Sequence, residues 1–139
     1  MEISFQCSLE VKAGAEKLWD ILTDVESWPS WQGTHFVKLN SPGRIKEGSE
    51  FTAELGGVKW DLKVTKAERP KTIVWVGKGL GLKGVHEWEF NEVEGTTIAT
   101  TRETMTGWML LLTYPLVKKG LYSTDEKWLA DLKVSAEIT

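Results

Sequence analysis

Two potential cations, His86 and Arg102, are the side chains of this sequence that indicate a chemical site most directly. In a strand, residues two apart face the same side, so His86 shares its face with Trp88 and Phe90. The alternation that buries these aromatic rings therefore turns the imidazole inward as well. There His86 could move a proton and Arg102 could stabilise a developing enolate, which makes both of them candidate catalytic residues.

The position of Arg102 depends on how its strand pairs with the strand of His86. If Gly95 lies in a three-residue hairpin loop, His86 faces Arg102 and Trp88 faces Thr100. A buried guanidinium needs an acidic partner, water, or an anionic or carbonyl-bearing ligand, so this register predicts a cationic wall that orients the polar end of a ligand. The strand alternates weakly, however, and a shift of one residue would leave Arg102 in water. That second register turns a different set of side chains inward: Ala99, Thr101, Glu103 and Met105.

Large aromatic residues recur on the predicted inward faces of the strands. The candidate lining residues of a ligand cavity are Trp60, Trp75, Trp88, Phe90, Thr100 and Trp108. Tyr114 and Tyr122, near the start of the last predicted helix, could add hydroxyl groups to the same cavity. Apolar pockets lined by aromatic rings with a few polar groups are the usual site for a small molecule. The alternative is that these rings only pack the core.

The motifs that suggest cofactors and metals are not supported by their surroundings. Residues 79–84 fit the pattern G-x-G-x-x-G, but they lie between two predicted strands, without the helix whose amides bind a pyrophosphate. His86 and Glu87 begin like a zinc-binding helix motif, yet their segment is extended. Cys7 and His86 would form a reactive pair only if a buried thiol ionised. We therefore expect no cofactor, no metal site and no covalent catalysis.

The composition describes one globular chain with an unusual number of tryptophans. Its 139 residues include eight Trp, against four Phe and two Tyr. Seventeen Lys and Arg against 20 Asp and Glu give a net charge of -3, and no stretch concentrates the basic residues, so nucleic acid is not expected as a partner. No linker rich in Pro, Gly or Ser separates two cores, which predicts a single domain over residues 1–139.

Membrane and export signals are not found in the sequence. The longest apolar run, residues 108–112, is far too short to cross a bilayer, and the first dozen residues alternate polar with apolar, unlike a secretory signal. The single Cys7 cannot form an internal disulfide, which is typical of a reducing compartment. We therefore expect a cytoplasmic protein without a transmembrane segment, present as a monomer or weak dimer.

The hydrophobic periodicity predicts the elements that would position these side chains. Alternation predicts a first strand over residues 3–11, and helical spacing predicts a helix over 15–24. Pro29 is typical of the first turn of a second, short helix. Pro115 and Gly120 predict an irregular entry over residues 107–116 to a long C-terminal helix. Six further strands, mostly joined by hairpins and therefore antiparallel, are expected over residues 36–39, 51–55, 58–65, 72–76, 85–90 and 96–105.

This order of elements, together with three sequence segments, resembles the helix-grip fold of the START-like (SRPBCC) superfamily. Residues 11–31, which end in the sequence WPSW, look like the family's run from a helix to its WP-x-W corner, and residues 84–90 and 129–137 are similar to its last hairpin and helix. The resemblance implies an α+β fold in which a curved, seven-stranded antiparallel sheet wraps around the C-terminal helix, with two short helices between the first two strands. It is closest to the polyketide cyclase/dehydrase and lipid transport branch, whose members bind or transform very different apolar molecules.

Three functions are open on this basis. The first is the binding of an apolar small molecule or lipid-like ligand in a cavity between the sheet and the C-terminal helix. The second is a polyketide cyclase/dehydratase-type enzyme in which His86 acts as acid and base. The third is a chaperone-activator-like interaction module, in which surface residues would matter and the cavity would be collapsed.

Overall fold

The sheet carries most of the candidate side chains, and it is built from hairpins. The computed structural model describes residues 1–34, 36–55 and 57–138. Its strands are β1 (Glu2–Val11), β2 (Val37–Leu39), β3 (Glu50–Leu55), β4 (Val58–Glu68), β5 (Thr72–Gly79), β6 (Leu82–Val93) and β7 (Thr96–Thr106). They form one antiparallel sheet in the order β1-β7-β6-β5-β4-β3-β2, which confirms the predicted seven-stranded sheet.

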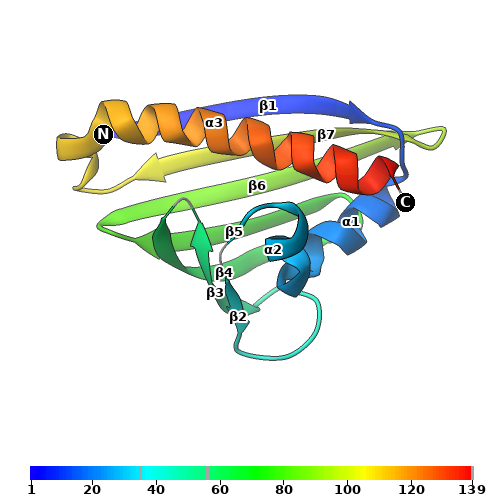
Figure 1. The fold of residues 1–139 in the computed structure, drawn as a ribbon, viewed down its shortest axis with the longest axis horizontal. Coiled ribbons are helices and arrows are strands. Elements are labelled where there is room, and N and C mark those ends of the chain that lie inside the picture. Colours follow the sequence, from blue (N-terminus) through cyan, green and yellow to red (C-terminus); the bar gives the residue numbers. More distant parts are fainter. Residues whose placement is uncertain (35, 56, 139) are drawn as a thin grey trace.

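One long helix lies along this sheet, and the shorter helices gather at its C-terminal end (Figure 1). The long helix is α3 (Leu110–Glu137); α1 (Ala15–Thr23), the 3-10 turn η1 (Val25–Ser27) and α2 (Trp28–Trp31) connect β1 to β2. Both α1 and α2 pack against α3. This arrangement confirms the helix-grip α+β fold. Within the described ranges, no helix has the length and apolar character needed to span a membrane.

A tight turn fixes the register of the hairpin between β6 and β7. Between β6 and β7, Glu94 and Gly95 have φ values of 52° and 80°, and Val93 pairs directly with Thr96. A two-residue loop with both φ values positive is the type I′ turn, whose twist matches that of the flanking strands. The predicted three-residue loop is therefore wrong, and every pairing between β6 and β7 is shifted by one residue.

The start of α3 also differs from the prediction. The helix begins at Leu110, so residues 110–116 are helical and the predicted irregular entry over 107–116 is wrong in this part. Pro115 lies inside the helix and lacks the N–H that would bond to the carbonyl of Leu111. Because both residues are exposed, water can satisfy this carbonyl.

The larger apolar core lies where α1, α2 and the C-terminal part of α3 meet the sheet. Trp28 is fully buried at its centre and donates its indole N–H to the carbonyl of Leu22 at 3.0 Å. The ring packs edge-on against Phe51 and Trp128, with centroids 5.6 Å and 4.9 Å away. Large rings fill this end of the molecule.

Candidate functional site

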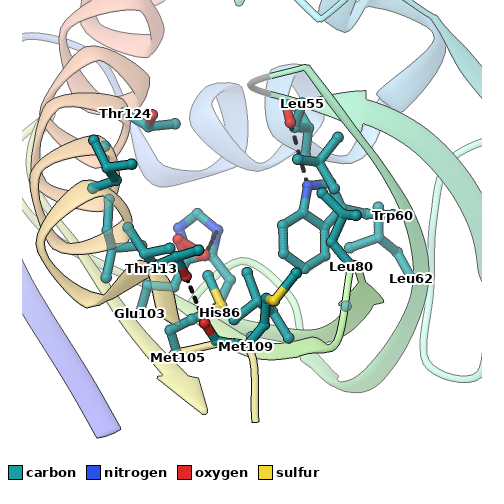
Figure 2. Close-up of a pocket in the computed structure, with 18 of the residues that line it drawn as sticks. Leu55, Trp60, Leu62, Leu80, His86, Glu103, Met105, Met109, Thr113 and Thr124 are labelled. Carbon is teal, nitrogen blue, oxygen red and sulfur yellow. Dashed lines mark hydrogen bonds and ion pairs between the residues drawn. The ribbon is translucent and has the colours of Figure 1, made fainter. Parts of the chain in front are cut away.

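A pocket lies between the sheet and α3, beside this aromatic core. Its volume is about 490 Å³, within the range of small-molecule sites. The strands supply one wall and α3 supplies the opposite one (Figure 2). The lining residues are Leu55, Val58, Trp60, Leu62, Trp75, Gly77, Leu80, Leu82, Gly84, His86, Glu103, Met105, Met109, Thr113, Leu116, Val117, Gly120, Leu121, Thr124 and Trp128.

Glycines on both walls contribute to the shape of the pocket. Gly77 on β5, Gly84 on β6 and Gly120 on α3 all line it. At position 77 a Cβ atom would lie 2.9 Å from Leu62, so this glycine permits close packing. A Cβ atom at position 120 would have no heavy atom within 4 Å, so this side of the helix borders open space. At position 84 the nearest atoms would belong to Met105, at an ordinary contact distance of 3.5 Å.

Exposed apolar side chains surround the mouth of the pocket. Leu80, in the turn between β5 and β6, is 62% exposed, and Leu116 on α3 is 77% exposed, although both also line the pocket. Leu111 and Leu112, one turn earlier on α3, are exposed as well. The interior of the pocket is therefore continuous with an apolar surface.

The polar end of the pocket is formed by three titratable side chains from three elements, which we call the His–Glu–Asp cluster: His86 on β6, Glu103 on β7 and Asp125 on α3. Imidazole Nδ1 lies 3.6 Å from Oε2 of Glu103, and Nε2 lies 4.0 Å from Oδ1 of Asp125. Figure 2 shows His86 and Glu103 close together beside α3, across the pocket from Trp60. Of the three, His86 and Glu103 line the pocket.

Packing fixes the orientation of the imidazole. Its Nε2 atom lies 2.6 Å from the hydroxyl oxygen of Thr101, a hydrogen bond whose direction depends on the tautomer. The ring stacks on Trp88, with centroids 5.1 Å apart, and lies edge-on to Trp75 and Trp128. His86 is therefore held between aromatic rings and its two carboxyl neighbours.

Burial dominates the electrostatics of this cluster. It raises the pKa of Asp125 from 3.8 to about 7 and lowers the pKa of His86 from 6.5 to about 3. Burial, followed by the charge of Asp125, raises the pKa of Glu103 well above 4.5. The contacts of His86 with the two carboxyl groups thus join groups that burial drives toward their neutral forms, not fully charged ion pairs.

The cluster is also the one group in the described part of the chain with three potential metal ligands, whose ligand atoms lie within 4.8 Å of one another. Each imidazole nitrogen lies near a different carboxyl group, and the two carboxyl groups also interact with each other. A histidine binds an ion through one nitrogen, at about 2.1 Å for zinc.

Arg102 does not belong to this cluster, so the prediction of a cationic wall is wrong. The one-residue shift places Glu103 opposite His86 and turns Arg102 to the outer face of the sheet. There its guanidinium donates from Nε to Oε1 of Gln6 at 2.9 Å and from Nη1 to Oε2 of Glu87 at 3.0 Å. The structure has the second register considered above, in which Arg102 lies in water.

Thr100 and Trp108 were predicted to line the cavity, and neither does. Thr100 lies on the same outer face as Arg102, with its hydroxyl oxygen 2.8 Å from that of Ser8. Trp108 is 64% exposed and lies outside the pocket lining. Its ring covers the turn at Gly81, where a Cβ atom would be 2.7 Å from the indole.

The two tyrosines near the start of α3 are also outside the lining. Tyr122 stacks on Phe5 of β1, with ring centroids 4.3 Å apart. Tyr114 packs against a small second core that includes Ile3 and Leu110. Neither tyrosine lines the pocket, so the prediction that their hydroxyl groups enter the cavity is wrong.

The remaining aromatic candidates divide between lining and core. Trp60 and Trp75 lie in the pocket wall. Trp88 and Phe90 are buried behind it, at 0% and 1% exposure, and are core residues in this structure. Contact of Trp60 or Trp75 with a ligand remains a prediction.

Three residues of the site were missed as candidates, although the sequence contains a signal for each. Glu103 belongs to the alternative inward set of its strand. Asp125 interrupts the apolar stripe of the last helix, four residues after Leu121 and three before Trp128. Trp128 belongs to this stripe and lines the pocket. A carboxylate within an apolar stripe is a signal for a site, because burying it is costly without a function or a partner.

Comparisons with known proteins identify a family and several structures with the same architecture. The family model described as "Polyketide cyclase / dehydrase and lipid transport" matches residues 2–137. No curated protein sequence matches the chain. A START superfamily protein from Mycobacterium smegmatis superposes with a TM-score of 0.80 at 18% identity, covering 97% of each chain.

Two enzymes of known structure also share the fold. The Zhui aromatase/cyclase from Streptomyces sp. R1128 superposes with a TM-score of 0.75 at 14% identity, covering 99% of this chain and 94% of that one. Norcoclaurine synthase from Thalictrum flavum gives 0.73 at 10% identity, covering 100% and 88%. At these identities the likeness concerns the fold alone.

Proposed function

Because the chain belongs to the polyketide cyclase / dehydrase and lipid transport family, we propose that it binds an apolar small molecule or a lipid-like ligand between the sheet and α3. The observation that carries this proposal is the pocket of about 490 Å³, whose lining is mostly apolar, with His86, Glu103, Thr113 and Thr124 as its polar side chains. The exposed Leu80 and Leu116 at its mouth support entry of an apolar ligand. The aromatic walls Trp60 and Trp75 would contact the body of the ligand, and His86 its polar end.

Filling the pocket tests this proposal. Gly120→Leu places a side chain at a pocket-lining position with no nearby atoms, and Lys119→Leu adds the same side chain at an exposed neighbouring position outside the lining. Binding of decanol, measured by tryptophan fluorescence, should be lost in Gly120→Leu and kept in Lys119→Leu. Equal affinities in the two variants would contradict a ligand site in this pocket.

Native mass spectrometry of gently purified protein gives an independent test. We expect a co-purifying small molecule, absent from Gly120→Leu. A clean apo mass, together with unchanged tryptophan fluorescence across fatty acids, quinones, aliphatic alcohols and amines and aromatic polyketides, would overturn the binding function.

A polyketide cyclase/dehydratase-type activity is the second candidate, and the His–Glu–Asp cluster is the observation that favours it. The cluster holds an imidazole beside two carboxyl groups in an apolar pocket, and burial raises the pKa of Asp125 to about 7, a value suited to proton transfer at neutral pH. Burial lowers the pKa of His86 to about 3, so a catalytic role of His86 requires that the bound substrate raises it. Arg102 lies too far outside to stabilise an enolate, so it has no part in this mechanism. Turnover of a poly-β-keto substrate analogue should fall in His86→Ala, and equal rates would remove His86 from catalysis.

The interaction-module hypothesis has the least support, because it expects a collapsed cavity. We keep the cytoplasmic location and the monomeric or weakly dimeric state as parts of the proposal. Size-exclusion chromatography across a range of concentrations tests the second, and a stable dimer at low concentration would contradict it.

A further inference from the structure

No side chain with a permanent positive charge faces the pocket within the described residues. Among the described residues that line it, none is Lys or Arg, and the ionisable side chains are His86 and Glu103. Asp125 lies directly behind them, fully buried. The arginine closest in sequence, Arg102, is bound to Gln6 and Glu87 on the opposite face of the sheet.

Hydrogen-bond acceptors in this cluster outnumber donors. Neither carboxyl oxygen of Asp125 has a partner in the described residues when the carboxyl groups are ionised. A hydrogen bond between Asp125 and Glu103 requires a proton on one of them, because carboxylates only accept. Buried acceptors without donors are unfavourable. Without a ligand, the two carboxyl groups are therefore most stable when one of them retains a proton.

Two hydroxyl groups near the cluster, those of Thr113 and Thr101, already have hydrogen-bond partners. The hydroxyl of Thr113, in the pocket wall, donates to the carbonyl of Met109 at 2.7 Å. The hydroxyl of Thr101 lies 2.6 Å from imidazole Nε2 and 3.3 Å from the carbonyl oxygen of Glu87. The indole N–H of Trp88 is a buried donor without a partner, but this residue does not line the pocket.

We propose that the pocket selects ligands with an apolar body and a cationic, hydrogen-bond-donating end such as a primary ammonium group. This inference rests on the proposed binding function and names its ligand class. An ammonium group brings three donors and a positive charge to Glu103 and, behind it, Asp125, and it replaces the retained proton. A carboxylate end would bring further acceptors and a like charge, so fatty acids are disfavoured.

Three probes of equal chain length test the selectivity: decylamine, decanol and decanoate, each below its micelle concentration at neutral pH. The amine is protonated there, as a lysine side chain is. Tryptophan fluorescence titration should give the amine an affinity about tenfold or more above that of the alcohol, with the carboxylate weakest. Equal affinities for amine and alcohol, or tightest binding of the carboxylate, would overturn the selectivity and leave the binding function intact. Failure of all three probes together with the wider ligand panel above would overturn the binding function itself.

Isosteric variants locate the selectivity. Glu103→Gln and Asp125→Asn remove a charge without changing volume, and we expect each to reduce the ratio of amine to alcohol affinity several-fold. The matched control is Glu89→Gln, which removes the same charge from an exposed position on the outer face of β6. Its ratio should equal that of the wild type. If Glu89→Gln lowered the ratio as much as Glu103→Gln, the preference would come from the net charge of the protein, and the inference would fail.

Discussion

The sheet and α3 form a closed core at one end of their interface, which we call the closed end, and a pocket at the other, which we call the open end. At the C-terminal end of α3, the rings of Trp28, Trp88 and Trp128 pack together and are at most 2% exposed, and Trp128 also forms the inner limit of the pocket. Toward the N-terminal end of α3, Gly84 on the sheet and Gly120 on the helix line opposite walls of the pocket. Side-chain size along otherwise similar strands thus separates the part that stabilises the fold from the part available to a ligand.

The largest difference between the ends should appear on truncating tryptophans. Trp28→Ala removes a fully buried, hydrogen-bonded ring and should lower the free energy of unfolding by about 3–5 kcal/mol. Trp60→Ala, in the half-buried pocket wall, should lower it by about 1 kcal/mol and weaken ligand binding. Urea denaturation measures both. Equal losses would mean that the open end is as tightly packed as the closed end; if Trp28→Ala does not fold, Trp28→Phe should still lose more stability than Trp60→Phe.

The border between the two ends should show a pH dependence. The folded-state pKa of Asp125, about 7, lies above its ordinary 3.8, so the folded protein binds this proton more tightly than the unfolded chain does. The stability contributed by this group is therefore present at low pH and falls as the pH rises from about 4 to 7. Glu103 acts in the same direction, whereas the lowered pKa of His86 makes the protein less stable as the pH falls below 6.5.

Asp125→Asn removes this titrating group and also the charge that helps to raise the pKa of Glu103, and both changes act in the same direction. The variant should gain stability relative to wild type by a few kcal/mol on going from about pH 4 to pH 8, as followed by thermal unfolding. A difference that stayed constant with pH would show that Asp125 titrates at its ordinary pKa.

A smaller change in stability should show whether α3 has free space at Gly120 in the open end. Gly120 lies in the interior of α3 with no atoms near its missing side chain, so Gly120→Ala should raise the free energy of unfolding by about 0.5–1 kcal/mol. Chemical denaturation is sufficient to measure it. A loss of stability would indicate that the helix needs glycine at this position for close packing.

The smallest effect is expected on the outer face. Arg102→Met removes an exposed pair with Glu87, whose side chains are 46% and 40% exposed. The free energy of unfolding should change by no more than about 0.5 kcal/mol, and decanol affinity should not change. A clear loss of decanol affinity in this variant would restore Arg102 as a pocket residue.

Much of this fold could be predicted from the sequence because the relevant signals are local. Alternation in residues 3–11 and the Pro29 corner correctly predicted β1 and the short helices. The family resemblance then implied the sheet wrapped around the last helix. These features depend on periodicity, which each segment carries by itself.

The site could be predicted less well, because the face that β7 turns to the pocket depends on one turn and the contribution of α3 depends on tertiary packing. Glu94 adopts a positive φ, which non-glycine residues adopt infrequently, and this shortens the loop between β6 and β7 to two residues. A one-residue change in register exchanges the faces of a strand, so Glu103 replaces Arg102 inside. His86 was predicted to face inward on the alternation of its own strand, and it does.

The central claim is that a ligand occupies the open end while the closed end remains a core. The indole N–H groups of the eight tryptophans report on both ends in one NMR titration with decanol. The account predicts that the signal of Trp60, in the pocket wall, shifts with saturation, while that of Trp19, packed in the core on α1, stays in place. Equal shifts of both signals, or a shift of Trp19 alone, would contradict it.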